Sequence, residues 1–399
     1  MQDPTLKAPC KYRKPSETAH DDGLEPVLPL DLNAITTFDD LAEAMARTAF
    51  GGRQLGEAVD VLMHMARDPD CAVVLTLSGA MTVAKMSLVI CEMVDRGLVQ
   101  AIVSTGALMA HGFVEATGLA HYKYRDGMND TELYQRGYNR VYDTLEPETN
   151  LEHVEFILGR ILSEWDPSET LCSRRLNAEL GKFLVQHHPT DRGVLKSAFE
   201  RDVPVYVPAL SDSEIGLGLG LFNRQQALRG GRRVSFDPFL DLEHFSSAVS
   251  KPKRLGIFTI GGGVPRNWAQ QVGPYLDVMG RHMGPEYGGT VRYQYGVRIC
   301  PEPVHWGGLS GCTYSEGVSW GKFVPSGSGG RYAEVLCDAT IAWPLVVKAA
   351  LQRLDRLGWV STKPALVGSE VWLPLERGSK PGSGGVEWPS RPVLEPQNE

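Results

Sequence analysis

An acid, an indole and a lysine lie close together in residues 315–322 (SEGVSWGK). Glu316 and Trp320 are four residues apart, so a short helix would place both side chains on one face. That face could hold an amine by ion pairing and cation–π contact. Lys322, beside an indole in an apolar setting, could lose its charge and attack a carbonyl or imine. The alternative is a surface lysine near a core tryptophan, and the segment alone leaves both interpretations open.

Small and acidic residues form a second group, because each set directly follows a predicted strand. In an open α/β sheet, ligands bind beyond the carboxyl ends of the strands. Small residues there let backbone N–H groups approach a phosphate, and aspartates could bind ribose hydroxyls. Glycine and aspartate are also common in turns and caps, and no GxGxxG motif is present, so the pattern only favours a nucleotide crevice. The residues are Ser78, Gly79, Ala80, Ser104, Thr105, Gly106, Asp212, Gly261, Gly262, Gly263, Asp338 and Ala339.

The elements that must position these residues follow a repeated strand, loop and helix pattern. Thr37 is expected to cap a first helix, Gly97 to end the helix over 83–94, and Pro344 to open the last helix, which Gly358 stops. A polar, aromatic stretch over 121–143 is expected to be a surface insertion. The pattern predicts an α/β fold in a single large domain, with a doubly wound, mostly parallel sheet and helices on both faces. Apolar strands are expected at 72–77, 98–103, 203–210, 255–260 and 332–336.

Composition narrows the class of protein. The chain has 399 residues, 42% of them hydrophobic, and a net charge of -8, which argues against nucleic acid or an anionic membrane as the main partner. We find no apolar run long enough for a membrane helix and no apolar centre of a secretion signal, so we expect a cytoplasmic protein. The seven cysteines form no CxxC pair, so reduced thiols and no metal site are expected. We expect an arm over 1–34, a catalytic domain over 35–372 and a flexible tail over 373–399.

Several segments together resemble deoxyhypusine synthases. They are 315–322 (SEGVSWGK), 337–345 (CDATIAWPL) and 259–264 (TIGGGV), with weaker matches at 207–212 (VPALSD), 103–107 (VSTGA) and 136–141 (RGYNRV). They also follow the family's order, and the resemblance runs from about residue 35 to about residue 360. It implies the Rossmann-like fold of that family and a homotetramer with active sites at subunit interfaces.

The resemblance also implies an activity and a set of site residues. NAD would oxidise the carbon beside the secondary nitrogen of a polyamine such as spermidine. The aminobutyl fragment would pass to Lys322 as an imine and then to an acceptor amine. Glu316, Trp320, Asn267 and Ser310 would line the amine site. NAD would be held by Ser78, Gly79, Ser104, Thr105, Gly106, Asp212, Gly262, Gly263, Asp338 and Ala339.

The chain also departs from the synthase pattern. Leu217, Trp306 and Leu309 stand where the family has acids, and Asn267 stands where it has a histidine. An unpaired buried charge is costly, so the donor could be shorter or less charged than spermidine, or could bind differently. Residues 305–311 (HWGGLSG) resemble bacterial synthase-like relatives. Transfer to a small amine, as in homospermidine formation, and polyamine oxidation therefore remain alternatives, as does a non-catalytic protein that binds NAD or polyamine.

Three features near these segments have open roles. Glu214 could replace a lost carboxylate. His111 could face the cofactor or be a satisfied core histidine. Residues 121–125 (HYKYR) could make a subunit contact or border the acceptor site.

Overall fold

The computed structural model describes residues 23–285 and 287–369. The predicted tail over 373–399 and most of the predicted arm over 1–34 lie outside these residues. Residues 24–31, at the start of the described chain, form no regular element, and the Leu28 amide donates to the Arg47 carbonyl at 2.9 Å. None of the helices within the described ranges has the length and apolar character needed to cross a membrane.

The centre of the fold is a six-stranded sheet in which every pair of neighbours is parallel. The first strand along the chain, β1, is central, and β2 and β6 follow it toward one edge. β7, β8 and β9 then extend the sheet toward the other edge, which gives the order β6-β2-β1-β7-β8-β9. The direction of building reverses between β1 and β7, and ligands of open parallel sheets bind at such a point. The strands are β1 Cys71–Leu77, β2 Ala101–Ser104, β6 Val205–Tyr206, β7 Arg254–Ile260, β8 Tyr293–Ile299 and β9 Arg331–Val335.

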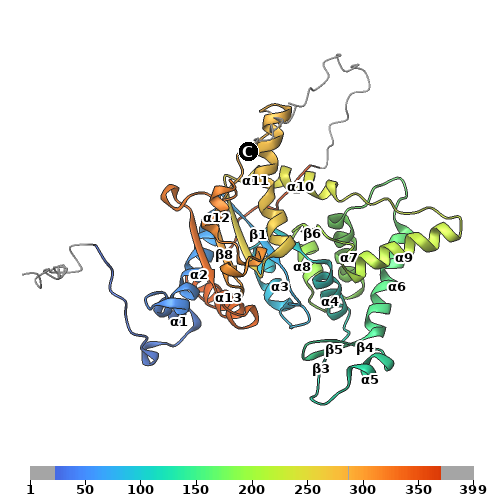
Figure 1. Cartoon of the computed structure of the whole chain (residues 1–399), viewed down its shortest axis with the longest axis horizontal. Coiled ribbons are helices and arrows are strands. Elements are labelled where there is room, and N and C mark those ends of the chain that lie inside the picture. Colours follow the sequence, from blue (N-terminus) through green and yellow to red (C-terminus); the bar gives the residue numbers. More distant parts are fainter. Residues whose placement is uncertain (1–22, 286, 370–399) are drawn as a thin grey trace, which may run out of the picture.

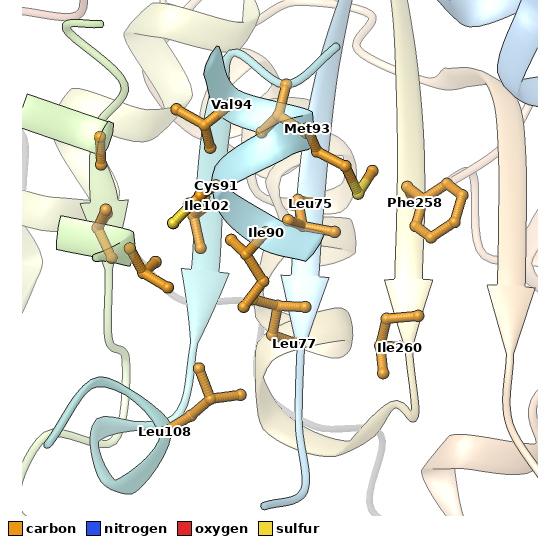
Figure 2. Close-up of a cluster of buried hydrophobic side chains, with 14 of the residues drawn as sticks. Leu75, Leu77, Ile90, Cys91, Met93, Val94, Ile102, Leu108, Phe258 and Ile260 are labelled. Atoms are coloured by element: carbon orange, nitrogen blue, oxygen red, sulfur yellow. The ribbon is translucent and has the colours of Figure 1, made fainter. Parts of the chain in front are cut away.

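Helices cover both faces of this sheet, as predicted. Alternate residues of β1 join different cores: Val73 and Leu75 pack in the larger one, and Ala72 and Val74 in the smaller one. Figure 2 shows α3 lying over β2 and β1 in the larger core, with Phe258 and Ile260 of β7 to one side. The helices that contribute to the larger core are α1 Phe38–Ala46, α2 Phe50–Arg67, α3 Ser87–Asp95, α4 Gly106–Ala116, α6 Glu148–Glu164, α7 Ser173–His187, α8 Val194–Glu200, α9 Glu214–Leu228 and α13 Ala339–Arg356. Those of the other are α10 Phe239–Val249, α11 Gly263–Met283 and α12 Tyr314–Ser319.

The predicted surface insertion folds as a small sheet of its own. Its three antiparallel strands have the order β3-β5-β4 and accompany a short helix. Figure 1 shows it below α4, at the end of α6. The elements are β3 Tyr122–Lys123, α5 Asp130–Gln135, β4 Tyr138–Val141 and β5 Thr144–Pro147.

Caps explain where several helices begin. Thr37 and Asp40 form a capping box at α1, which confirms the predicted cap. Thr105, Ser213 and Asp338 cap α4, α9 and α13 with their side chains. Three helices therefore begin at residues that directly follow strands or strand-end loops.

Some predicted boundaries were wrong. The helix expected over 83–94 begins only at Ser87, because the Thr82 hydroxyl donates to the Leu108 carbonyl at 2.8 Å and holds the preceding residues in turns. The last helix begins at Ala339 rather than at Pro344, which lies inside it. Asp338 caps that helix, so its start needed no proline.

The strand predictions also need correction. The strand expected over 203–210 contains only Val205–Tyr206, since the prolines on both sides lack the amide that a ladder requires. β2 begins at Ala101 rather than at residue 98. β8 was not foreseen, because YQYGVRI carries polar and glycine residues inside a strand.

Candidate functional site

The loops after β1 and β7 meet at the point where the strand order reverses. The Gly262 amide donates to Ser78 Oγ at 2.9 Å, and Ser78 Oγ donates to the Ile260 carbonyl at 3.2 Å. A Cβ on Gly262 would lie 2.4 Å from Ser310 Cα, so only glycine allows this approach. Predicted cofactor residues Ser78 and Gly262 are thus brought together, with predicted substrate residue Ser310 beside them.

The loops after β2 and β6 meet in the same way. A Cβ on Gly106, at the start of α4, would lie 2.2 Å from Ser213 Oγ, at the start of α9. Asp212, next to Ser213, is exposed. Ser104 Oγ is buried and has no hydrogen-bond partner among the described residues. The predicted cofactor residues 104–106 and Asp212 therefore share one edge of the sheet.

Asp338 and Ala339 are farther along this edge. They follow β9, and β8 separates that strand from β7. The Asp338 carboxylate accepts the Thr340 amide at 2.8 Å as the cap of α13. The cap explains the residue's local role, and its predicted contact with NAD stays a prediction.

The predicted lysine site assembles around the first turns of α11. Lys322 Nζ donates to Asn267 Oδ1 at 3.1 Å and lies 5.6 Å from the centroid of the Trp320 ring. Backbone hydrogen bonds fix the lysine, since its carbonyl accepts the Tyr293 amide and its amide donates to the Gly317 carbonyl. The side chain is buried, with only 8% of its surface exposed. The lysine therefore points into protein, and the predicted surface alternative is wrong.

The surroundings of Lys322 disfavour its charged form. Burial lowers the pKa of Lys322, and the positive charge of Arg266 lowers it further, whereas Cys312 and Glu316 act in the opposite direction. Arg266 is itself buried and lies 5.5 Å from the centroid of the Tyr314 ring. A larger fraction of Lys322 is therefore neutral at a given pH than for an ordinary lysine. A neutral amine is the form that attacks an imine or carbonyl.

The other predicted amine-site residues are open in the single chain. Glu316 lies in the first turn of α12 and is exposed, and Trp320 is 63% exposed. Leu217 and Trp306, which replace acids of the synthase pattern, are 68% and 70% exposed. These four side chains do not close a pocket around a ligand within one chain.

A cluster that sequence reasoning did not assemble lies beside the β2 and β6 edge. Glu146 of β5 is buried between two histidines, 2.6 Å from His111 Nδ1 and 3.2 Å from His121 Nε2. The other ring nitrogen of His111 lies 3.9 Å from Glu214. Glu146 gave no sequence signal, because only the folding of the insertion against α4 brings it to the histidines.

Comparisons with known proteins agree with the motifs. The deoxyhypusine synthase family model matches residues 40–350. A "Probable deoxyhypusine synthase 2" from Methanosarcina acetivorans is 35% identical over 333 residues, 83% of this chain and 91% of its own. A "Deoxyhypusine synthase-like protein" from Chlorobaculum parvum is 32% identical over 315 residues, 78% and 86% of the two chains.

A solved structure shows the same fold. The crystal structure of a "putative deoxyhypusine synthase" from Entamoeba histolytica superimposes with a TM-score of 0.52 at 16% identity. The match covers 82% of this chain and 97% of that one. By motif, by sequence and by fold, the chain belongs to the deoxyhypusine synthase family.

Proposed function

We propose that the chain is an NAD-dependent transferase that moves an aminobutyl or related fragment from a polyamine to an acceptor amine, through an imine on Lys322. Family membership supports transferase activity. The observation that carries the proposal is the environment of Lys322, a buried lysine next to an indole, with its pKa lowered by burial. Such a lysine is suited to covalent catalysis at a carbon–nitrogen double bond.

The residues at the sheet edge fit a dinucleotide. Numbered along the chain, the six strands have the order 3-2-1-4-5-6, which is the order of dinucleotide-binding sheets. α11 begins at Gly263 without a side-chain cap, so its first N–H groups are available to a phosphate. The space in front of Gly263 is open, since a Cβ at this position would meet no other atom within 4 Å. The loops at Gly79, Thr105 and Gly263 would hold the phosphates, and Asp212 and Asp338 the riboses.

When bound, NAD supplies the hydride acceptor for the carbon beside the donor nitrogen and returns the hydride at the end of the cycle. Lys322 then adds its neutral Nζ to the oxidised carbon of the donor. A carbon–nitrogen bond to Lys322 forms, the bond to the donor amine breaks, and the proton from Nζ leaves with that amine. The acceptor amine attacks the same carbon and releases Lys322 with its proton. Asn267 Oδ1 accepts a hydrogen bond from Nζ and so orients the nitrogen for attack.

The identity of the acceptor is a second question. The resemblance of residues 305–311 to bacterial synthase-like relatives puts a small-amine acceptor, as in homospermidine formation, on an equal footing with a protein lysine. Simple polyamine oxidation, and binding without turnover, are the remaining candidates. Large exposed apolar side chains at Leu217, Trp306 and Trp320 also support burial between subunits, so we include a homotetramer in the proposal. We place the catalytic domain at 35–372 and the protein in the cytoplasm.

Trapping with borohydride tests the covalent step. The protein is incubated with NAD and spermidine, reduced, digested and analysed by mass spectrometry. An aminobutyl adduct on Lys322 is expected in the wild type and in the control Lys348→Arg, whose lysine is exposed on α13. The adduct should be absent from Lys322→Arg. Transfer that persists in Lys322→Arg would end the proposal.

Product analysis with labelled spermidine and putrescine tests the acceptor. Labelled homospermidine would identify a small-amine acceptor. Labelled protein would identify a lysine side chain as the acceptor, and an aldehyde or cyclic imine would identify oxidation. Tight NAD binding with no product from any di- or triamine would contradict catalysis.

A further inference from the structure

The cluster of His111, His121, Glu146 and Glu214 links four separate segments of the chain. His111 comes from α4, Glu146 from β5 and Glu214 from the first turn of α9, while His121 lies just before β3. Their side chains become progressively more open toward one end: His121 and Glu146 are 0% and 2% exposed, His111 is 13% and Glu214 is 33%. The open end lies next to Ser213 and Gly106, at the proposed cofactor edge.

Lys85, beside His121, decides which ring nitrogen of that histidine accepts a hydrogen bond. Lys85 Nζ lies 3.0 Å from His121 Nδ1 and 3.6 Å from Glu115. An ammonium group only donates, so His121 Nδ1 must accept and His121 Nε2 must carry its proton toward Glu146. Glu146 then accepts one hydrogen from each histidine. Glu146 thus lies between one ring nitrogen of each histidine.

The same contacts argue against a metal ion. The ligand-type atoms of His111, His121 and Glu146 lie within 4.8 Å of one another, and two histidines with a carboxylate are a zinc-type donor set. A histidine bound to zinc donates its other ring N–H to an acceptor. Here His121 has a cationic donor at that position, in Lys85. Lys85 therefore occupies the place that an acceptor would hold beside a zinc-bound His121.

Glu146 leaves His111 with one reactive nitrogen. His111 Nδ1 donates to Glu146, so Nε2 is the nitrogen that can gain or lose a proton. Although burial lowers the pKa of His111, the hydrogen bond and charge of Glu146 outweigh it and, with Glu214, raise the pKa above its ordinary value. Burial also raises the pKa of Glu146, but both histidines more than reverse this and lower it to about 2. Glu146 is thus a fixed anion that favours the charged form of His111.

Glu214 has one oxygen that nothing in the described chain satisfies. Its Oε1 faces His111 Nε2, whereas its Oε2 is buried with no hydrogen-bond partner among the described residues. A buried, unpaired carboxylate oxygen is costly and calls for a donor. The Glu214 side chain as a whole is 33% exposed, so an ammonium group can approach its carboxylate from the open side, and the proposed substrates are polyamines.

We propose that Glu214 and His111 form a proton-linked amine subsite, in which Glu214 binds an ammonium group of the substrate and His111 releases its Nε2 proton to solvent as that group arrives. This inference rests on the proposed function for its ligand class. Before the amine arrives, the charged form of His111, which Glu146 favours, would neutralise Glu214. An incoming ammonium takes over that role, and two cations cannot share one carboxylate without repulsion. His111 then releases its Nε2 proton to solvent and keeps its Nδ1 proton, which faces Glu146. The released proton balances the charge of the incoming ammonium group.

Calorimetry with spermidine and with putrescine tests the linkage directly. Titration at pH 7 in phosphate and in Tris separates proton release from the heat of binding, because the two buffers differ in ionisation enthalpy. Wild-type protein should release up to about one proton per site. The affinity should rise with pH while His111 loses its proton and then level off. The charged and titratable groups around His111 are Glu146, Glu214, His121, Lys85 and Glu115.

Two substitutions and two controls sharpen this test. His111→Asn keeps a donor for Glu146 but removes Nε2, so proton release should vanish and affinity should lose its pH dependence. Glu214→Gln should weaken amine binding by about tenfold or more. The controls are His153→Asn and Glu155→Gln on α6, both exposed, and both should behave as wild type.

The outcomes separate this subsite from the transfer reaction. Unchanged proton release in folded His111→Asn, or unchanged affinity in Glu214→Gln, would overturn the subsite whether or not Lys322 forms an adduct. Stoichiometric uptake of Zn²⁺ that His121→Asn abolishes would overturn it as well. Proton release that depends on Glu214, with no adduct on Lys322, would keep the subsite and reject the transfer mechanism.

Discussion

Two buried lysines of this fold have opposite surroundings. Lys196 on α8 and Lys322 after α12 are 7% and 8% exposed. Lys196 Nζ donates to three backbone carbonyls, those of His188, Pro189 and Asp191, at 2.9, 2.5 and 2.8 Å. Lys322 Nζ has one amide oxygen, an indole ring and a nearby guanidinium. The same side chain at the same burial is therefore structural in one place and poised for chemistry in the other, and the partners of the nitrogen decide which.

The largest expected difference between Lys322 and Lys196 is in the rate of catalysis. Lys322→Arg keeps a positive charge but has no nucleophilic amine, so aminobutyl transfer should fall by on the order of 10³-fold or more. Lys196→Arg should keep the rate per folded molecule, since Lys196 only holds a loop. Product formation from spermidine and NAD measures both. Equal losses in the two variants, corrected for folded protein, would erase the distinction.

The next effect is on stability. Lys196→Met removes the donor that three backbone carbonyls share and should lower the free energy of unfolding by about 1–3 kcal/mol. Urea denaturation followed by circular dichroism measures it, with the exposed Lys348→Met as the control. A loss below that of the control would show that the three hydrogen bonds do not hold α8 in place.

The pH profile of Lys322 sharpens the comparison further. Because burial and Arg266 lower its pKa, the neutral amine should form, and modification by a small aldehyde with borohydride should level off, at a lower pH than for exposed lysines. Asn267→Asp would place a carboxylate at the present 3.1 Å contact and should raise the pKa, moving the profile to higher pH. Peptide mass spectrometry across pH reads both variants. A profile that matches Lys348 would contradict the proposed environment.

The smallest expected effect is a gain in stability. The folded-state pKa of Lys322 is lowered, so between that value and the ordinary lysine value the unfolded chain binds more protons, and stability rises with pH. At neutral pH the buried charge therefore opposes folding. Lys322→Met should raise the free energy of unfolding by on the order of 1 kcal/mol and remove that slope. A destabilised Lys322→Met would mean that the site stabilises the ammonium.

Sequence reasoning reached the parts of this site that are local or carried by motifs. Lys322 and Trp320 are two residues apart, and the family resemblance supplied Asn267, which indeed contacts the lysine. The strand-end loops at Ser78 and Gly262 followed from the alternation of strands and helices. Their direct hydrogen bond did not, because it joins residues 184 positions apart.

The Glu146 cluster shows what could not be predicted. Its carboxylate lies in an insertion whose short strands carry no regular apolar pattern, and its partners come from α4 and from the loop before β3. β8 was missed for a related reason: Arg298 is buried in it and pairs with Glu334 of the next strand, so a polar residue stands where an apolar one was expected. Where contacts between distant residues stabilise a strand, its sequence need not show the apolar pattern from which strands are predicted.

The hydrogen bond from the Gly262 amide to Ser78 Oγ has a consequence for how the molecule opens. β1 and β7, which it joins, are the two central strands of the sheet and are buried along almost their whole length. Interior strands exchange their amide hydrogens only on global unfolding. The Gly262 amide lies just past β7 and is held by a side-chain oxygen, so deuterium should enter it more slowly than exposed loop amides but faster than the amides of β1 and β7.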